Sequence, residues 1–152
     1  MRISKHISYK EAVHSNTAKR RGIENKPNDD QLYNMAKVAH NIFEPLRLYV
    51  GGAIKINSFF RSEELNKAIG GSSKSQHCQG CALDIDDIYG HKSNYQMFEY
   101  IRENLDFDQL IYEFGDADNP DWVHVSYVSS KENRNRVLRA VKNNGKTSYQ
   151  VF

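Results

Sequence analysis

The sequence predicts an α+β fold in which N-terminal helices pack on a mainly antiparallel central sheet. Three observations support this fold class. Apolar residues recur at helical spacing between residues 29 and 48. Strand-like segments dominate after residue 82, and the last two flank Asn144-Gly145, a strong hairpin signal. Helices followed by strands, without regular alternation, are typical of α+β proteins.

Each predicted element follows from hydrophobic periodicity and from the residues that bound it. In chain order the elements are a short helix at 9–13, a helix at 29–48, a strand at 53–58, a helix at 62–69, a strand at 82–87, a helix at 93–104, and strands at 108–113, 122–127, 136–142 and 146–152. The remainder of residues 1–28 looks irregular, and 72–81 is expected to be a polar loop. Asp29 or Asp30 is expected to cap the long helix, and Ser62 to cap the short one at 62–69.

Length and composition predict one globular domain that spans residues 1–152. Apolar residues make up 39% of the chain and charged residues 26%, a balance that excludes a disordered or collagen-like chain. No apolar stretch approaches the length of about 18 residues that a transmembrane helix needs, and the N-terminus lacks the apolar core of a signal peptide. We therefore expect a monomer that is made in the cytoplasm and does not insert into membranes.

The charge balance disfavours nucleic-acid binding. The 21 basic and 19 acidic residues give a net charge of +2, whereas nucleic-acid binders of this size are usually more basic or carry a basic stripe. One basic run lies near the C-terminus, at Arg134, Arg136, Arg139, Lys142 and Lys146. We interpret this run as a solvated face, and salt-sensitive binding of nucleic acid through it is the lowest-ranked hypothesis.

The two cysteines, Cys78 and Cys81, lie three positions apart. A disulfide scaffold needs more cysteines, and a four-cysteine zinc ribbon needs a second pair. A thioredoxin-like motif would precede a helix, whereas the residues after Cys81 are typical of a strand. We interpret both cysteines as small, semi-buried residues and leave open whether they contact a metal.

One segment, Ser75 to Asp84, combines residues that can converge on a metal ion. His77 lies in the predicted loop, and Asp84 follows seven residues later inside a predicted strand. Side chains alternate along a strand, so the small Ala82 shares a face with Asp84 and leaves room beside its carboxylate. Gly80 allows a tight turn through which His77 can fold back over the strand.

A second segment places His124 inside a strand, between Val123 and Val125 on the opposite face. A histidine in such a position needs a partner, because an unpaired buried polar group is costly. Taken alone, His124 could be a hydrogen-bonded core residue. Together with His77 and Asp84, it would complete the three-ligand set of a catalytic zinc site that leaves a fourth position open. Zinc in such a site lowers the pKa of water to about 7.

The combined pattern S-x-H-x-x-G-x-A-x-D followed by W-V-H resembles the zinc D-Ala-D-Ala carboxypeptidase and L-alanyl-D-glutamate peptidase family. This family shares its fold with the hedgehog signalling domain. The similarity extends over most of the chain and includes residues 56–62, which are similar to the family's S-G-Y-R-S motif. The resemblance implies that His77, Asp84 and His124 are zinc ligands.

The resemblance also implies a catalytic acid/base, which in this family is usually a glutamate three residues before the second histidine. Asp121 occupies that position and is our first candidate, although its side chain is one methylene shorter. Glu113, on the preceding predicted strand, is the second candidate. The alternatives are that Asp121 is a turn residue after Pro120 and that Glu113 is an ordinary strand-end carboxylate.

Two further residues are candidates for substrate binding. Arg61 matches the family's substrate-binding arginine, and its guanidinium can hold a peptide carboxylate through two hydrogen bonds. The alternative for Arg61 is a surface ion pair with Glu63 or Glu64. Ser75 could donate a hydrogen bond to the same carboxylate, or it could simply cap the loop. The other histidines, His6, His14, His40 and His91, show no convergent pattern.

The resemblance predicts a zinc peptidase that cleaves the stem peptides of peptidoglycan, either as a D-Ala-D-Ala carboxypeptidase or as an L-Ala-D-Glu endopeptidase. The chain resembles a phage lysis enzyme that reaches the cell wall after release by a separate lysis protein. The alternative from another functional class is a recognition module of the same fold that no longer catalyses, and the aspartate at position 121 is its main support.

Overall fold

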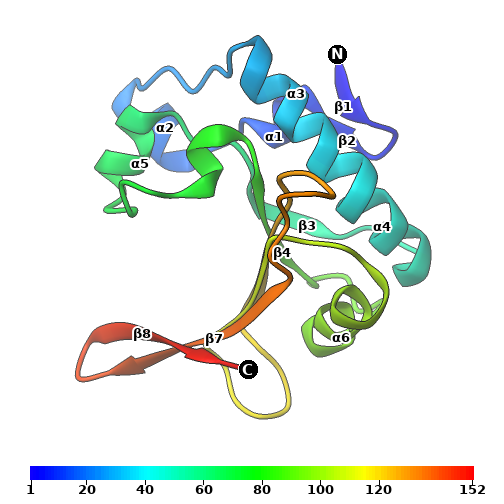
Figure 1. Cartoon of the computed structure of the whole chain (residues 1–152). Helices are drawn as coiled ribbons and strands as arrows, with labels where there is room; N and C mark the ends of the chain where they lie inside the picture. Colours follow the sequence, from blue (N-terminus) through cyan, green and yellow to red (C-terminus); the bar gives the residue numbers. More distant parts are fainter.

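The computed structural model describes residues 1–152 and has the predicted α+β architecture (Figure 1). Its main sheet contains six strands in the order β3-β4-β6-β5-β7-β8. Their bounds are Lys55–Ser58 for β3, Ala82–Asp86 for β4, Gln109–Glu113 for β5, Trp122–Ser126 for β6, Arg136–Asn143 for β7 and Lys146–Val151 for β8. Neighbouring strands are antiparallel except β5 and β7, which run parallel. The sheet is therefore mixed, although antiparallel pairs dominate.

The parallel pair arises because β6 already has a neighbour on each side, β4 and β5. The chain that leaves β6 must cross to the free edge of β5 before it can pair. The buried Asp108 fixes the end of this crossing, because its carboxylate accepts two hydrogen bonds from the Arg134 guanidinium, at 2.9 and 2.8 Å. The bonded Arg134 guanidinium holds the pKa of Asp108 below its usual range. Gln76 donates to the same carboxylate at 2.8 Å, so Asp108 also ties the crossing to the loop before β4.

Helices cover one face of the sheet and only one end of the opposite face. The helical elements are α1 (Tyr9–Ala12), α2 (Asn16–Arg21), α3 (Asp29–Val38), a π-helical segment (Ala39–Phe43), α4 (Glu44–Val50), α5 (Glu63–Ala68), a 3₁₀ turn (Gln76–Gln79) and α6 (Asn94–Asn104). With the sheet nearly edge-on in Figure 1, α3, α4 and α6 lie on its right, and α2 and α5 lie at its upper left. None of the helices combines the length and apolar character that crossing a membrane requires.

The N-terminal region departs from the sequence-based expectation. Residues 1–28 are not mainly irregular, because β1 (Arg2–Ser4) and β2 (Ile7–Ser8) form a small hairpin and α2 follows the expected α1. These elements are too short to produce a detectable period. The long helix is capped by Asn28 rather than by Asp29 or Asp30, since Asn28 and Gln31 exchange hydrogen bonds of 2.8 Å in a capping box. Ser62 caps α5, as predicted.

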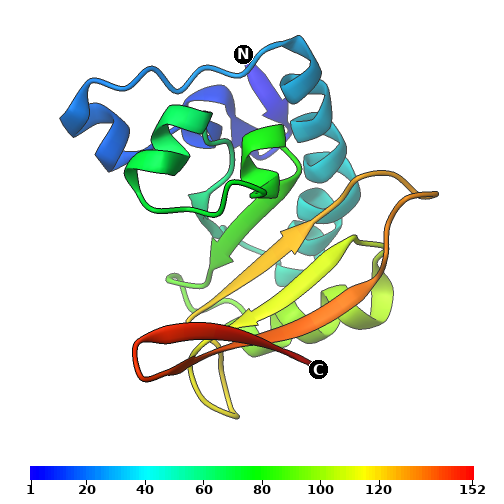
Figure 2. The same cartoon turned by 60° about the vertical axis from the view of Figure 1, so that its left-hand side comes forward.

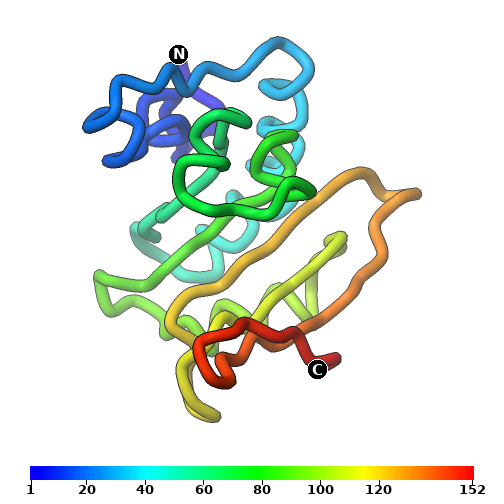
Figure 3. Tube along the Cα trace, turned by 90° about the vertical axis from the view of Figure 1, so that its left-hand side faces the viewer, coloured from blue at the N-terminus to red at the C-terminus, as the bar shows by residue number.

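The two faces of the sheet differ in character, as the period of two along each strand requires. The face toward α3, α4 and α6 is apolar and fully buried, and it includes Leu83, Ile85, Leu110, Tyr112, Val123 and Val125. The opposite face carries polar side chains in its centre. This open face lies toward the viewer in Figure 3, between the segment around α5 above and the β7–β8 hairpin below.

Gly80 sets the position of the 3₁₀ turn against α3. Its backbone is left-handed, with φ of +75°, and a Cβ there would lie 2.6 Å from the carbonyl oxygen of Gln31 and 2.8 Å from Cγ of Met35. Gly70 has nearly the same φ, +76°, but a Cβ there would meet nothing within 4 Å. An alanine at Gly70 would therefore meet backbone strain alone, whereas an alanine at Gly80 would meet both backbone strain and a steric clash.

We expect Gly80→Ala to destabilise the protein more than Gly70→Ala. The left-handed conformation costs about 1–2 kcal/mol in either variant, and overpacking adds about 1–3 kcal/mol at Gly80 alone. Because 1 kcal/mol corresponds to about 2–4 °C in a chain of this size, thermal unfolding followed by circular dichroism resolves the two variants. Equal melting temperatures would contradict the proposed contact between Gly80 and α3.

Candidate metal centre

Asp84 and His124 face each other across two neighbouring strands. Asp84 of β4 lies opposite His124 of β6, and His124 lies opposite Ile111 of β5. Nδ1 of His124 is 2.8 Å from Oδ1 of Asp84. The sheet register alone therefore brings the predicted carboxylate and one predicted histidine together, on the open face of the sheet.

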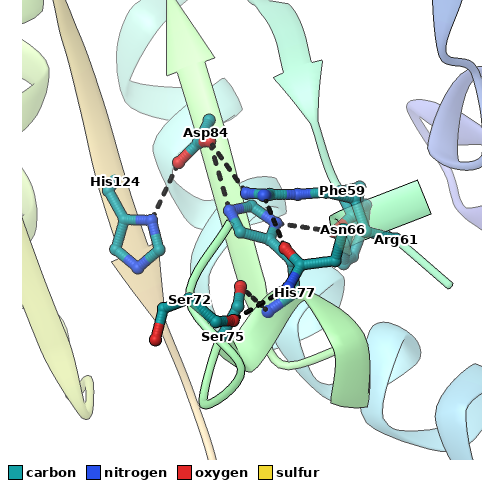
Figure 4. A network of polar contacts seen from close by, with 8 residues as sticks. All are labelled: Phe59, Arg61, Asn66, Ser72, Ser75, His77, Asp84 and His124. Carbon is teal, nitrogen blue, oxygen red and sulfur yellow. Dashed lines mark hydrogen bonds and ion pairs between the residues drawn. The ribbon is translucent and has the colours of Figure 1, made fainter. Parts of the chain in front are cut away.

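His77 reaches the same carboxylate from the 3₁₀ turn (Figure 4). Nδ1 of His77 lies 2.7 Å from the carbonyl oxygen of Phe59, which can only accept a hydrogen bond, so Nδ1 carries the proton. Nε2 then points at Asp84, with 3.1 Å between Nε2 and Oδ2, but it makes no hydrogen bond although it is buried.

This arrangement fits a metal ion. In neutral His77 the Nε2 lone pair faces a carboxylate oxygen, an unfavourable contact unless a cation lies between them. One ligand atom from each of His77, Asp84 and His124 lies within 4.8 Å of the other two. Two imidazole nitrogens and one carboxylate oxygen form a ligand set of catalytic zinc sites. The phenylalanine carbonyl that holds His77 also fixes its tautomer, as partners of metal-binding histidines do.

The ionisation of the three groups follows from burial and from their mutual contacts. Burial would raise the pKa of Asp84, but the positive charge that His77 and His124 carry when protonated more than offsets burial and holds this pKa well below its usual range. Burial lowers the pKa of His77, which favours the neutral imidazole that a metal ligand needs. For His124, burial acts downward, but the hydrogen bond to Asp84 prevails and raises the pKa.

Arg61 lies beside this cluster. Its Nη2 is 4.0 Å from Oδ2 of Asp84, and its Nη1 donates to Oδ1 of Asn66 at 3.0 Å. Its Nε is buried without a hydrogen-bond partner. Arg61 forms no ion pair with Glu63 or Glu64, so the surface ion pair considered from sequence is not present.

The structure separates the two candidates for the catalytic base. Glu113 lines the same cavity of about 680 Å³ as His77, Asp84 and His124. Its side chain makes no hydrogen bond, and burial raises its pKa to about 7. Asp121 is exposed and lines a different cavity, beside Phe114.

Alternation along β6 explains this difference. Asp121 precedes His124 by three positions, and an odd separation along extended backbone directs two side chains to opposite faces. Glu113 lies directly opposite Trp122, which shares the face of His124. The placement therefore favours Glu113, the second candidate from sequence, over Asp121.

Ser75 lines the cavity but has a structural role as well. Its hydroxyl caps the 3₁₀ turn by accepting a hydrogen bond from the amide of His77, at 3.3 Å. Cys78 and Cys81 are free thiols, both buried, and neither belongs to the group of three residues that could hold a metal ion. Burial raises the pKa of both thiols.

The sequence alone did not indicate the cavity residues that follow β6 in the chain. The same cavity that contains the three converging residues is also lined by Arg134, Arg136, Leu138 and Tyr149. Two of them, Arg134 and Arg136, belong to the basic run for which the sequence predicts a solvated face. These residues reach the cavity because β7 pairs in parallel with β5, and this pairing cannot be predicted from the sequence pattern. The alternation along residues 136–142 indicates only which side chains of that strand share a face.

Comparison with known proteins assigns the chain to a family. The model of the peptidase M15 family matches residues 5–126, which include every predicted site residue. No curated protein matches the sequence. M15 peptidases are zinc-dependent metallopeptidases, and the His77, Asp84 and His124 group provides a matching ligand set. On the strength of a match over most of its length, the chain belongs to the peptidase M15 family.

Proposed function

We propose that the chain is a zinc peptidase that hydrolyses a peptide bond in the stem peptides of peptidoglycan. The observation that carries this proposal is the convergence of His77, Asp84 and His124 in one cavity. The same cavity is lined by Glu113, whose side chain makes no hydrogen bond. Zinc held by the three ligands would polarise the scissile carbonyl and acidify water. The rest of the mechanism follows from the chain's own side chains.

Glu113 is the proposed general base and acid. Its carboxylate makes no hydrogen bond within the protein and lies on the open face of the sheet, so it is free to accept a proton from the attacking water. As the C–O bond forms and the C–N bond breaks, Glu113 returns that proton to the leaving amine. A carboxyl group whose pKa is about 7 can carry out both transfers near neutral pH.

Arg61 is the proposed anchor for a substrate carboxylate. The buried Nε lacks a partner, and the guanidinium lies next to Asp84, so a bound carboxylate would lie beside the metal ligands. Holding the substrate there would position the scissile bond over the metal site. Ser75 can add a hydrogen bond from the same wall of the cavity.

Digestion of purified peptidoglycan by the zinc-loaded protein tests this proposal. We expect new amino groups, and mass spectrometry of the products identifies the bond: loss of single D-alanine residues indicates a carboxypeptidase, whereas release of peptides that begin with D-glutamate indicates an L-Ala-D-Glu endopeptidase. A chelator should abolish the release and added zinc should restore it. A folded, zinc-loaded protein that releases nothing would favour the non-catalytic recognition module.

We propose further that the chain acts as a phage-type lytic enzyme on the cell wall. This part of the proposal depends on the sequence resemblance. Co-expression with a membrane-permeabilising lysis protein should lyse bacterial cells, and the same pair with an inactive peptidase variant should not.

A further inference from the structure

The β7–β8 hairpin forms one wall of the cavity that contains the metal-binding group. The family match ends at Ser126, and the hairpin begins only at Arg136. It nevertheless contributes Arg136, Leu138 and Tyr149 to the cavity lining. In Figure 2 the hairpin lies along the lower edge of the sheet, below the strands that carry the metal ligands. The hairpin therefore provides cavity residues that the family match does not cover.

Strand register fixes which hairpin side chains face the cavity. Leu138 lies opposite Ile111, which itself lies opposite His124, and Ala140 lies opposite Glu113. Because directly paired residues share a face, Leu138 and Ala140 lie on the open face of the sheet. Together with Ile111 they form a small apolar cluster, separate from the main core. Ile111 and Leu138 of this cluster line the floor of the cavity between the metal site and the hairpin, whereas Ala140 is fully buried and borders the cavity beside Phe114.

Arg136 supplies an unpaired positive charge at the edge of this floor. It precedes Leu138 by two positions, so both side chains share the open face. Its side chain is exposed and makes neither an ion pair nor a hydrogen bond, although its backbone amide donates to Asp108. Arg134, in contrast, is already held by the Asp108 carboxylate, with 2.8 Å between Nη2 and Oδ2. Arg136 is therefore the hairpin guanidinium that remains free to bind an anion in the cavity.

We propose that the hairpin forms a second substrate subsite, in which Arg136 binds a carboxylate of the peptide while the floor of Ile111 and Leu138 receives a small apolar side chain. This inference rests on the proposed function, and it names the substrate class as a peptide with at least two carboxylates, one for Arg61 and one for Arg136. Stem peptides that contain D-glutamate and D-alanine have both the carboxylates and the small methyl side chains.

The spacing of the strands is compatible with such a substrate. Neighbouring strands lie about 4.8 Å apart, so Leu138, two strands from His124, is about 10 Å away from it. An extended chain covers about 3.3–3.6 Å per residue, so about three residues span this distance. A short peptide can therefore lie across the strands with its scissile bond at the metal site and a carboxylate at Arg136.

Steady-state kinetics with two forms of one substrate test the subsite. The substrates are a stem pentapeptide with a free α-carboxylate on D-glutamate and the same peptide with that group as a carboxamide. We expect Arg136→Gln to raise KM for the carboxylate form about 10- to 100-fold, in line with the loss of one charged hydrogen bond, and to leave KM for the carboxamide nearly unchanged. Lys146→Gln is the matched control, because it removes the same charge from the first residue of β8, outside the cavity lining.

Binding of the carboxylate peptide, measured by calorimetry on zinc-loaded Glu113→Gln with and without Arg136→Gln, separates this inference from the proposed function. If neither peptide is hydrolysed but binding still depends on Arg136, the proposed peptidase function fails and the subsite stands. If hydrolysis proceeds and Arg136→Gln changes KM equally for both peptides, or changes neither KM nor binding, the subsite is overturned while the peptidase function stands. If Lys146→Gln also loses binding, the loss in Arg136→Gln reflects general electrostatic attraction to the hairpin. That result would also overturn the subsite.

Discussion

Glu113→Gln is expected to lower kcat about 10²- to 10⁴-fold, the usual contribution of a positioned general acid/base. Glutamine has the same shape but can neither accept nor return the proton. Because Glu113 is not one of the three residues that converge on the metal, zinc content should be unchanged. The measurement combines peptidoglycan hydrolysis with metal analysis of the same sample.

Asp121→Asn is the matched control for this prediction. The side chain of Asp121 is exposed and lines another cavity, so we expect activity within a factor of a few of the wild type. A large loss of activity in Asp121→Asn, with Glu113→Gln still active, would contradict the assignment of the base.

The wild-type pH profile should depend on the same residue. Burial raises the pKa of Glu113, so the carboxylate form that accepts a proton is lost as the pH falls below about 7. A bound cation favours the carboxylate, so the acidic limb of kcat/KM should lie at or below that pH. Glu113→Gln should lack this limb, and an unchanged limb in the variant would assign the titration to another group.

Replacing a proposed metal ligand is expected to have an equally large effect, through loss of the metal. His124→Ala or Asp84→Asn should remove zinc binding and hydrolysis together, because a site with three protein ligands needs all three to hold the ion. At a free zinc concentration 100 times Kd, binding stabilises the wild type by about 2.7 kcal/mol. Differential scanning calorimetry should therefore show a zinc-dependent rise of about 5–11 °C for the wild type, since 1 kcal/mol corresponds to about 2–4 °C.

The control for the ligand variants is His40→Ala. His40 is exposed, and its Nδ1 contacts the carbonyl oxygen of Ala36 in its own helix. This variant should keep the zinc-dependent rise of the wild type. A zinc-dependent rise that persists in His124→Ala would show that the metal binds elsewhere.

The convergence of His77, Asp84 and His124 could be predicted from sequence because short-range features bring these side chains together. His77 and Asp84 are joined by one turn at Gly80 and one strand, and alternation along β6 placed His124 between two buried valines. The boundaries of β4, β5 and β6 were likewise correct to within about one residue, because each strand is a short apolar segment with clear ends.

The remaining features depend on long-range pairing, which periodicity does not encode. The parallel contact between β5 and β7 brings Arg136 and Tyr149 to the cavity, whereas the basic run alone suggested a solvated surface. The choice between Asp121 and Glu113 needed the sheet register as well. Motif position favoured Asp121, but pairing across β5 and β6 places Glu113 on the face of His124.

The most direct test of the central claim is hydrolysis of purified peptidoglycan by protein of known zinc content. We predict one zinc per chain and release of new amino groups, both lost in His124→Ala, while Glu113→Gln loses only the release. Folded wild-type protein that contains no zinc after exposure to it, or that holds zinc and releases no amino groups, would contradict the proposed zinc peptidase function.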